Sequence, residues 1–143
     1  MKSAGRGDSR YSLDGGVLIA LALNEPNAHW LRDSMLKGEV EAYTHELALM
    51  ELTYILCRRL GWHIAQVKLN SLLRSRVIKV INFTEILEEA AKLKCERALS
   101  MADCCTIALA KLYNCTALFV RKEKELEEEM LRRPLDVKLE FLY

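Results

Sequence analysis

Four acidic residues, far apart in the sequence, are the candidates for chemistry in this chain. Asp14 follows a short apolar run, Glu51 lies inside a long apolar stretch, Asp103 follows a serine by three positions, and Glu123 begins a glutamate-rich segment. Carboxylate oxygens are the ligands that hard divalent cations such as Mg²⁺ and Mn²⁺ prefer. If the fold brings these acids together, the chemistry they favour is metal-assisted attack by water.

Glu51 has the strongest case among them. The segment 45–60 predicts a helix that is apolar nearly all round, and we therefore expect this helix to be buried. A carboxylate between Leu47 and Ile55 on such a helix costs several kcal/mol of stability unless a cation compensates its charge. A salt bridge to Arg58, seven residues on along the same side, is the structural alternative.

The other three acids also have structural interpretations. Asp103 completes an S-x-x-D capping box with Ser100, and the start of a helix also favours an ionised carboxylate. Glu123 is one of five glutamates between positions 123 and 129, where the alternative is a solvated charged helix. For Asp14, which ends a strand before Gly15 and Gly16, the alternative is a plain turn aspartate.

Strand and helix signals alternate along the chain. Strands are predicted at 11–13, 41–44, 77–83, 116–120 and 137–142; the β-branched third one reads as a central strand and the alternating last one as an edge strand. Helices are predicted at 17–23, 26–37, 45–60, 63–75, 85–99, 101–113 and 122–133. Gly15 and Gly16 are expected to form a turn, and Asn24, Thr84 and Ser100 to cap helices.

This alternation predicts an α/β fold, with a central parallel sheet, right-handed crossovers and helices on both faces. Ligand sites in such folds gather at the carboxyl ends of the strands. Asp14 and Glu123 each follow a strand, whereas Glu51 and Asp103 lie early in helices that start at that edge. The topology alone therefore predicts that the four acids share one rim.

Length and composition limit the remaining possibilities. The 143 residues fit one domain at 11–143, preceded by a loose tail at 1–10. A net charge of +1 gives no global field for nucleic acid, so RNA binding would depend on a local cluster such as Arg74, Arg76 and Lys79. The apolar run at 17–23 is too short to cross a bilayer, and we expect a cytoplasmic protein with no membrane contact.

Cysteine and histidine do not form metal-binding patterns. The five cysteines are an odd number without a C-x-x-C pair, and we interpret them as reduced core residues. The three histidines are not paired at ligand spacing, so each is expected to be structural. The metal ligands, if any, are therefore carboxylates.

Three segments resemble the PIN domain of VapC-type toxins. They are Tyr11-Ser12-Leu13-Asp14 with Val17-Leu18-Ile19-Ala20, then Leu49-Met50-Glu51-Leu52-Thr53-Tyr54 with Arg58-Arg59-Leu60-Gly61, and Ala102-Asp103-Cys104-Cys105-Thr106-Ile107-Ala108-Leu109-Ala110. The likeness covers about positions 11 to 130. It implies a three-layer α/β/α fold with strand order 3-2-1-4-5 and Mg²⁺- or Mn²⁺-dependent cleavage of RNA.

The resemblance also implies site residues and partners. In the family, the acids that match Asp14, Glu51 and Asp103 bind metal, and a fourth acid follows the fourth strand, where Glu123 lies here. It implies the toxin of a type II toxin–antitoxin pair, which forms a homodimer and is inhibited by a small antitoxin protein. A lysine or arginine near the rim, such as Arg121, would bind phosphate.

Two departures from the family pattern support a different function. Gly15 and Gly16 stand where a hydroxyl residue usually follows the first aspartate, and Arg121-Lys122-Glu123 replaces a Thr-x-Asp motif. The alternative is a catalytically impaired PIN-like module that binds a protein partner. A third interpretation is a receiver-like domain that accepts a phosphoryl group on Asp14.

Overall fold

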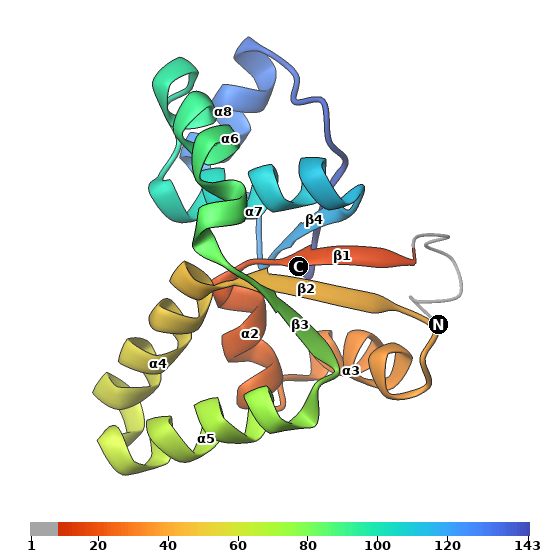
Figure 1. Ribbon diagram of the computed structural model, residues 1–143, viewed down its shortest axis with the longest axis vertical. Coiled ribbons are helices and arrows are strands. Elements are labelled where there is room, and N and C mark those ends of the chain that lie inside the picture. The colour runs from red at the N-terminus through yellow and green to blue at the C-terminus, as the bar shows by residue number, and fades with distance from the viewer. Residues whose placement is uncertain (1–8) are drawn as a thin grey trace.

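A five-stranded parallel sheet runs through the middle of the protein (Figure 1). The structure, a computed structural model, describes residues 9–143, so the tail predicted at 1–10 lies almost wholly outside the described residues. The strand order is β3-β2-β1-β4-β5, which confirms the predicted α/β fold and its order 3-2-1-4-5. The strands are β1 (Arg10–Leu13), β2 (Glu41–His45), β3 (Ile78–Ile81), β4 (Thr116–Phe119) and β5 (Leu139–Phe141).

Helices cover both faces of this sheet (Figure 1). One layer contains α2 (Gly15–Ala22), the short 3₁₀ helix η1 (Pro26–Ala28), α3 (His29–Leu36), α4 (Glu46–Leu60) and α5 (Trp62–Ser75). The opposite layer contains α6 (Phe83–Glu96), α7 (Met101–Tyr113) and α8 (Lys124–Arg132). Each layer buries its own apolar cluster against the sheet, which gives the three-layer α/β/α arrangement.

The central strand β1 joins the two layers. Tyr11 and Leu13 are fully buried in the core beneath α2, and Ser12 points to the opposite face. Ser12 Oγ donates a hydrogen bond of 2.8 Å to the backbone oxygen of Thr106 in α7. A buried hydroxyl without a partner would cost about 1–3 kcal/mol. This bond therefore fixes α7 on the strand that leads into Asp14.

The third strand was placed wrongly by the sequence prediction. β3, predicted to be a central strand, lies at one edge of the sheet. β5 lies at the other edge, which confirms the edge position predicted for the last strand. Ile78 and Ile81 are buried, whereas Lys79 is exposed and pairs with Glu41. β-branched residues suit any strand that packs one face, so this composition does not distinguish an edge strand from a central one.

Two helix starts also differ from the prediction. Gly15 and Gly16 are the first residues of α2 rather than a turn, and Asp14 caps that helix by accepting from Gly16 N at 3.3 Å. Thr84 lies inside α6, whose N-cap is Asn82. Both helices therefore begin directly after their strands, which carries Asp14 to the carboxyl edge of the sheet.

No helix in residues 9–143 is both long and apolar enough to span a membrane. The apolar run of α2 is instead packed in the core, with Val17 and Leu18 fully buried. Its hydrophobicity is explained by contacts with the sheet and with α4.

Candidate active site

Asp14 lies at the junction of β1 and α2. Its backbone N–H donates to Leu118 O at 3.1 Å, which continues the pairing of β1 with β4 by one residue. Its side chain accepts from Gly16 N through Oδ2 and from Thr106 Oγ1 through Oδ1, at 3.3 and 3.4 Å. Burial raises the pKa of this carboxyl, and the hydrogen bonds from the start of α2 and from Thr106 oppose that rise.

Glu51 reaches the same edge from α4. This helix is buried on one face only, through Ala48, Leu52 and Leu56. The prediction of a helix buried all round was wrong, because Met50 is 65% exposed on the outer side. An apolar composition includes side chains that face solvent, so it does not by itself predict burial.

The carboxylate of Glu51 occupies space that is open because residue 15 is glycine. A Cβ atom on Gly15 would lie 2.0 Å from Glu51 Oε1. That oxygen is buried and has no hydrogen-bond partner among the described residues. Arg58, the alternative partner, instead lies over the Tyr54 ring, with its guanidinium carbon 5.0 Å from the ring centroid.

The charge environment of Glu51 is unfavourable. Burial raises the pKa of Glu51, and the negative charges of Asp14 and Asp103 raise it further. The second of these neighbours enters from α7, in the opposite helical layer. Asp14 at the end of β1, Glu51 in α4 and Asp103 in α7 thus bring their carboxylates to the same edge of the sheet.

Asp103 lies in the first turn of α7. Ser100 caps this helix, since its Oγ accepts from Asp103 N at 3.1 Å, as the capping box predicts. Burial, followed by the charge of Asp14, raises the pKa of Asp103 to about 6. The cap and the acidic neighbourhood coexist: Ser100 accepts from the backbone of Asp103 and also hydrogen-bonds its carboxyl, which opposes the rise in pKa caused by burial and by Asp14.

Glu123 is the N-cap residue of α8, but its side chain makes no capping hydrogen bond. It is exposed, and with Glu125 it contributes negative charge that raises the pKa of Asp103. Glu125 was not singled out by the sequence, because five neighbouring glutamates look alike locally. Its position two residues after Glu123 was the only available signal.

The four predicted acids line one pocket of about 430 Å³ at the carboxyl edge of the sheet. Arg121 is the one basic residue in its lining, and Glu125 is a fifth acid. In residues 9–143, no three acidic, histidine or cysteine side chains already form a cluster that could hold a metal ion. The donor set nevertheless fits a hard divalent cation, because all the acids offer oxygen and one buried oxygen lacks a partner.

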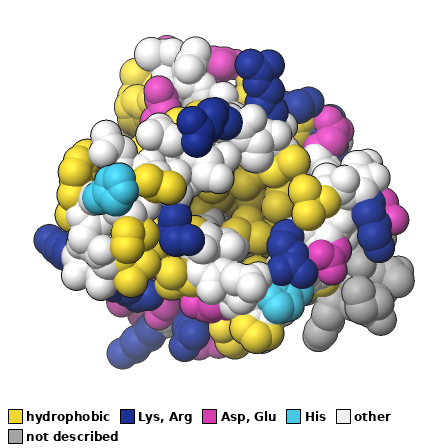
Figure 2. Space-filling view, turned by 90° about the horizontal axis from the view of Figure 1, so that it is seen from below, with side chains coloured by type: hydrophobic (Ala, Val, Ile, Leu, Met, Phe, Trp, Pro, Cys, Tyr) yellow, Lys and Arg dark blue, Asp and Glu magenta, His cyan; other side chains and the backbone are white. Residues whose placement is uncertain are grey.

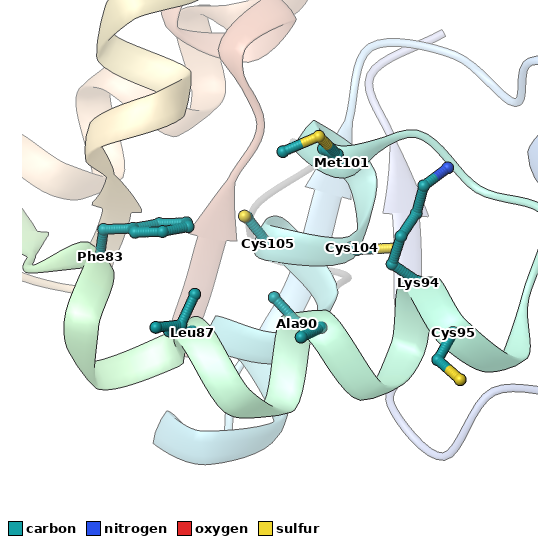
Figure 3. Close-up of a pocket in the computed structure, with 9 residues that line it drawn as sticks. Phe83, Leu87, Ala90, Lys94, Cys95, Met101, Cys104 and Cys105 are labelled. Atoms are coloured by element: carbon teal, nitrogen blue, oxygen red, sulfur yellow. The ribbon is translucent and has the colours of Figure 1, made fainter.

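A second pocket of about 400 Å³ lies between α6 and α7 and has a different chemistry (Figure 3). Cys104 and Cys105 contribute to its lining, and burial raises the pKa of Cys104 to about 11 and that of Cys105 as well. Thiols that stay protonated are poor nucleophiles and poor metal ligands. Cys95 is exposed in this pocket, so the prediction that all cysteines lie in the core was wrong for it.

The sequence pattern of the PIN domain matches residues 11–128. The chain belongs to the PIN domain family. The match contains Asp14, Glu51, Asp103 and Glu123, as well as all three of the segments that carry the resemblance. No sequence among the curated proteins matches this PIN domain.

Solved structures share the fold at low sequence identity. VapBC2 from Rickettsia felis, bound to a promoter DNA fragment, has a TM-score of 0.69 and 17% identity over 92% of this chain and 98% of the other. A Klebsiella pneumoniae toxin–antitoxin complex has a TM-score of 0.64 and 15% identity, with coverage of 94% and 98%. Mycobacterium tuberculosis VapC20, a sarcin-ricin loop cleaving toxin, has a TM-score of 0.59 and 21% identity, with coverage of 76% and 87%.

Proposed function

We propose that this PIN domain is a divalent-metal-dependent endoribonuclease and the toxin of a type II toxin–antitoxin pair. The observation that carries the proposal is the buried, unpartnered Oε1 of Glu51 beside Asp14 and Asp103. A protein gains no stability from such an arrangement, since buried charges are normally paired. A divalent cation that binds there would offset most of their negative charge.

Asp14, Glu51 and Asp103 are the residues that would hold Mg²⁺ or Mn²⁺. Glu123, together with Glu125, would act through water or at a second ion. When bound, the cation would stabilise negative charge on a phosphodiester and lower the pKa of water. Because the acids do not yet form a ligand cluster, we expect their side chains to draw together on binding.

Arg121 is suited to bind the phosphate of the substrate. It lines the acidic pocket, and its guanidinium carbon lies 4.9 Å from the centroid of the Tyr143 ring. Guanidinium groups form paired hydrogen bonds with phosphate oxygens. Stacking on an aromatic ring leaves the edge of the guanidinium free to donate. Of the basic residues that the sequence suggested, Lys79 is already paired with Glu41 at 3.4 Å.

A small antitoxin protein is the partner we propose, and a homodimer is the assembly. The structural neighbours from R. felis and K. pneumoniae are toxin–antitoxin assemblies, which supports an antitoxin by analogy. The face seen in Figure 2 has hydrophobic side chains gathered in a hollow, with lysine and arginine side chains around it. Met50, Tyr54 and Trp62 also line an apolar groove of about 440 Å³ between α4 and α5. Exposed apolar surface of this kind favours protein contacts.

We also propose that the protein acts in the cytoplasm, where an RNA substrate would be available to it.

The alternative is a PIN module that binds its partner without cleaving RNA. Gly15, Gly16 and Arg121 are its support, because they depart from the family pattern. Gly15 has a second explanation, since it leaves room for the Glu51 carboxylate. Calorimetry with Mn²⁺ separates the two functions, because an impaired module that has lost its metal shows no binding heat.

The test of the proposed function is RNA cleavage by the purified protein. Single-stranded RNA is incubated with wild type, Asp14→Asn and Glu128→Gln, in Mg²⁺, in Mn²⁺ and in EDTA. Glu128 is an exposed acid of α8 outside the pocket, so its substitution is the matched control. We expect cleavage by wild type and E128Q in either metal, and none by D14N or in EDTA. Intact RNA with the wild-type protein in both metals would reject the nuclease function.

A further inference from the structure

Behind the acidic pocket, three side chains form a buried series of hydrogen bonds. His45 ends β2 and Thr106 lies in the second turn of α7, and neither has exposed surface. His45 Nε2 lies 2.9 Å from Thr106 Oγ1, and Thr106 Oγ1 lies 3.4 Å from Asp14 Oδ1. The series thus connects the sheet, α7 and the first acid of the site.

The direction of these bonds follows from the backbone of α4. Ala48 N–H donates to His45 Nδ1 at 3.1 Å, so this nitrogen must carry a lone pair rather than a proton. Burial lowers the pKa of His45 to about 4, so the ring is neutral at physiological pH. A neutral ring with a free Nδ1 carries its proton on Nε2. His45 therefore donates to Thr106 Oγ1.

Thr106 consequently has one proton to give and two acceptors within reach. They are the backbone oxygen of Ala102 at 3.1 Å and Asp14 Oδ1 at 3.4 Å. Bonds to a carboxylate are stronger than bonds to a neutral carbonyl, so an ionised Asp14 draws the proton toward itself. Gly16 N–H holds the other oxygen, Oδ2, at 3.3 Å. Both oxygens of Asp14 are then held by hydrogen bonds from the protein, Oδ1 by Thr106 and Oδ2 by Gly16.

We propose that His45 and Thr106 are positioning residues that hold Asp14 Oδ1 in the orientation needed to bind a divalent metal ion. Gly15 and Gly16 carry no hydroxyl, and the hydroxyl that reaches Asp14 comes instead from Thr106. Residues that hydrogen-bond to a metal ligand orient that ligand, and their substitution typically weakens metal affinity ten- to a hundredfold. The inference rests on the proposed metal-dependent function.

Four substitutions separate positioning from helix capping. His45→Asn keeps an acceptor at the place of Nδ1 and so keeps the cap on Ala48, but it is too short to reach Thr106. His45→Gln keeps a donor at the place of Nε2 and loses the cap. Thr106→Val removes the hydroxyl at nearly constant volume, and Thr106→Ser keeps it. Two variants therefore break the series, and two retain it.

Mn²⁺ affinity by calorimetry and melting temperature are measured for the wild type and all four variants. We expect H45N and T106V to bind Mn²⁺ at least about tenfold more weakly. The Mn²⁺ affinities of H45Q and T106S should stay within about threefold of wild type. H45Q should nevertheless melt at a lower temperature, because it has lost the cap of α4. If affinity instead follows melting temperature across the set, or is unchanged in H45N and T106V, the positioning role is wrong.

A second readout uses the wild type alone and needs neither metal nor RNA. Long-range ¹H–¹⁵N spectra of the histidine rings should show His45 protonated on Nε2 and unprotonated on Nδ1. The opposite tautomer would overturn the proposal even in an active nuclease. A wild type that binds no Mn²⁺ would overturn both the positioning role and the proposed function. An Nε2 proton combined with normal Mn²⁺ binding in H45N and T106V would reject the positioning role alone.

Discussion

Two glutamates, the buried Glu129 and the half-buried Glu51, show opposite solutions to the burial of a carboxylate. Glu129 in α8 is 4% exposed and is paired with Arg132 and, at 3.7 Å, with Arg97. The hydrogen bond from Arg132 is the main cause of its lowered pKa. Glu51 has no basic partner within residues 9–143, one of its oxygens is unsatisfied there, and its pKa is raised.

The difference separates structure from function. The ion pair of Glu129 is built into the fold, because Arg97, which follows α6, also donates to the backbone oxygens of Arg133 and Pro134 and so connects the end of α6 to the segment between α8 and β5. No ion pair among the described residues holds Glu51, and the charges that raise its pKa belong to two other acids. Acids that a fold leaves uncompensated together are suited to an external cation. The following substitutions should therefore affect the two regions in opposite directions.

Glu129→Gln should produce the largest loss of stability. The substitution leaves Arg97 without its counter-charge, and removing one partner of a buried pair is strongly destabilising because the other charge stays behind uncompensated. Urea unfolding measures the loss. Glu128→Gln, next to it on the solvent side of α8, should change stability by no more than about 0.5 kcal/mol. Equal effects of the two substitutions would mean that the ion pair is not structural.

The second largest effect should be the pH dependence of stability that comes from Asp103. Its folded pKa of about 6 lies above the ordinary aspartate value of 3.8, so the folded state binds more protons between these two pH values. Metal-free wild type should therefore gain stability relative to Asp103→Asn as the pH falls from about 7.5 to 4. We expect a gain of roughly 2 kcal/mol, allowing for partial exposure. Urea unfolding in EDTA at several pH values measures it, and a pH-independent difference would contradict the acidic cluster.

Glu51→Gln should raise the stability of the metal-free protein by roughly 1 kcal/mol, because a neutral amide costs less to bury than a carboxylate beside two other acids. The same variant should lose Mn²⁺ binding and RNA cleavage. Unfolding in EDTA and calorimetry together measure this exchange of stability for function. If E51Q is less stable than wild type and still binds Mn²⁺, Glu51 has a structural role like that of Glu129.

Gly15→Ala should have the smallest effect on stability, within about 1 kcal/mol, because the helical preference of alanine offsets the crowding. Its Cβ atom would meet Glu51 Oε1, so the carboxylate must move away. We expect about tenfold weaker Mn²⁺ binding, measured by calorimetry. Unchanged affinity would show that the position of this carboxylate does not limit binding.

The sequence was sufficient for most of the fold, because helix and strand periods and the strand–helix alternation are local signals. Asp14 and Asp103 could be placed at the sheet edge from topology alone, since each lies next to a strand end or a helix start. The edge position of β3 could not, because it depends on which strands pair over long distances.

The details of the site were less accessible. His45 and Thr106 are separated by 61 positions, and only the packing of α7 on the sheet brings them within 2.9 Å. Glu125 could not be distinguished from four neighbouring glutamates that share its local pattern. The space for Glu51 depends on a missing Cβ atom in another helix, and no local pattern reveals that.

The most direct test of the account is a calorimetric titration of Mn²⁺ into wild type, Asp103→Asn and Ser100→Ala. Ser100→Ala removes the cap of α7 and the contact of Ser100 with the Asp103 carboxyl but keeps that carboxyl, so it should melt lower, by about 1 kcal/mol of stability, and still bind Mn²⁺. Asp103→Asn keeps the capped backbone and should lose Mn²⁺ binding. Wild type that shows no binding heat, or D103N that binds as tightly as wild type, would contradict a metal site built from these carboxylates.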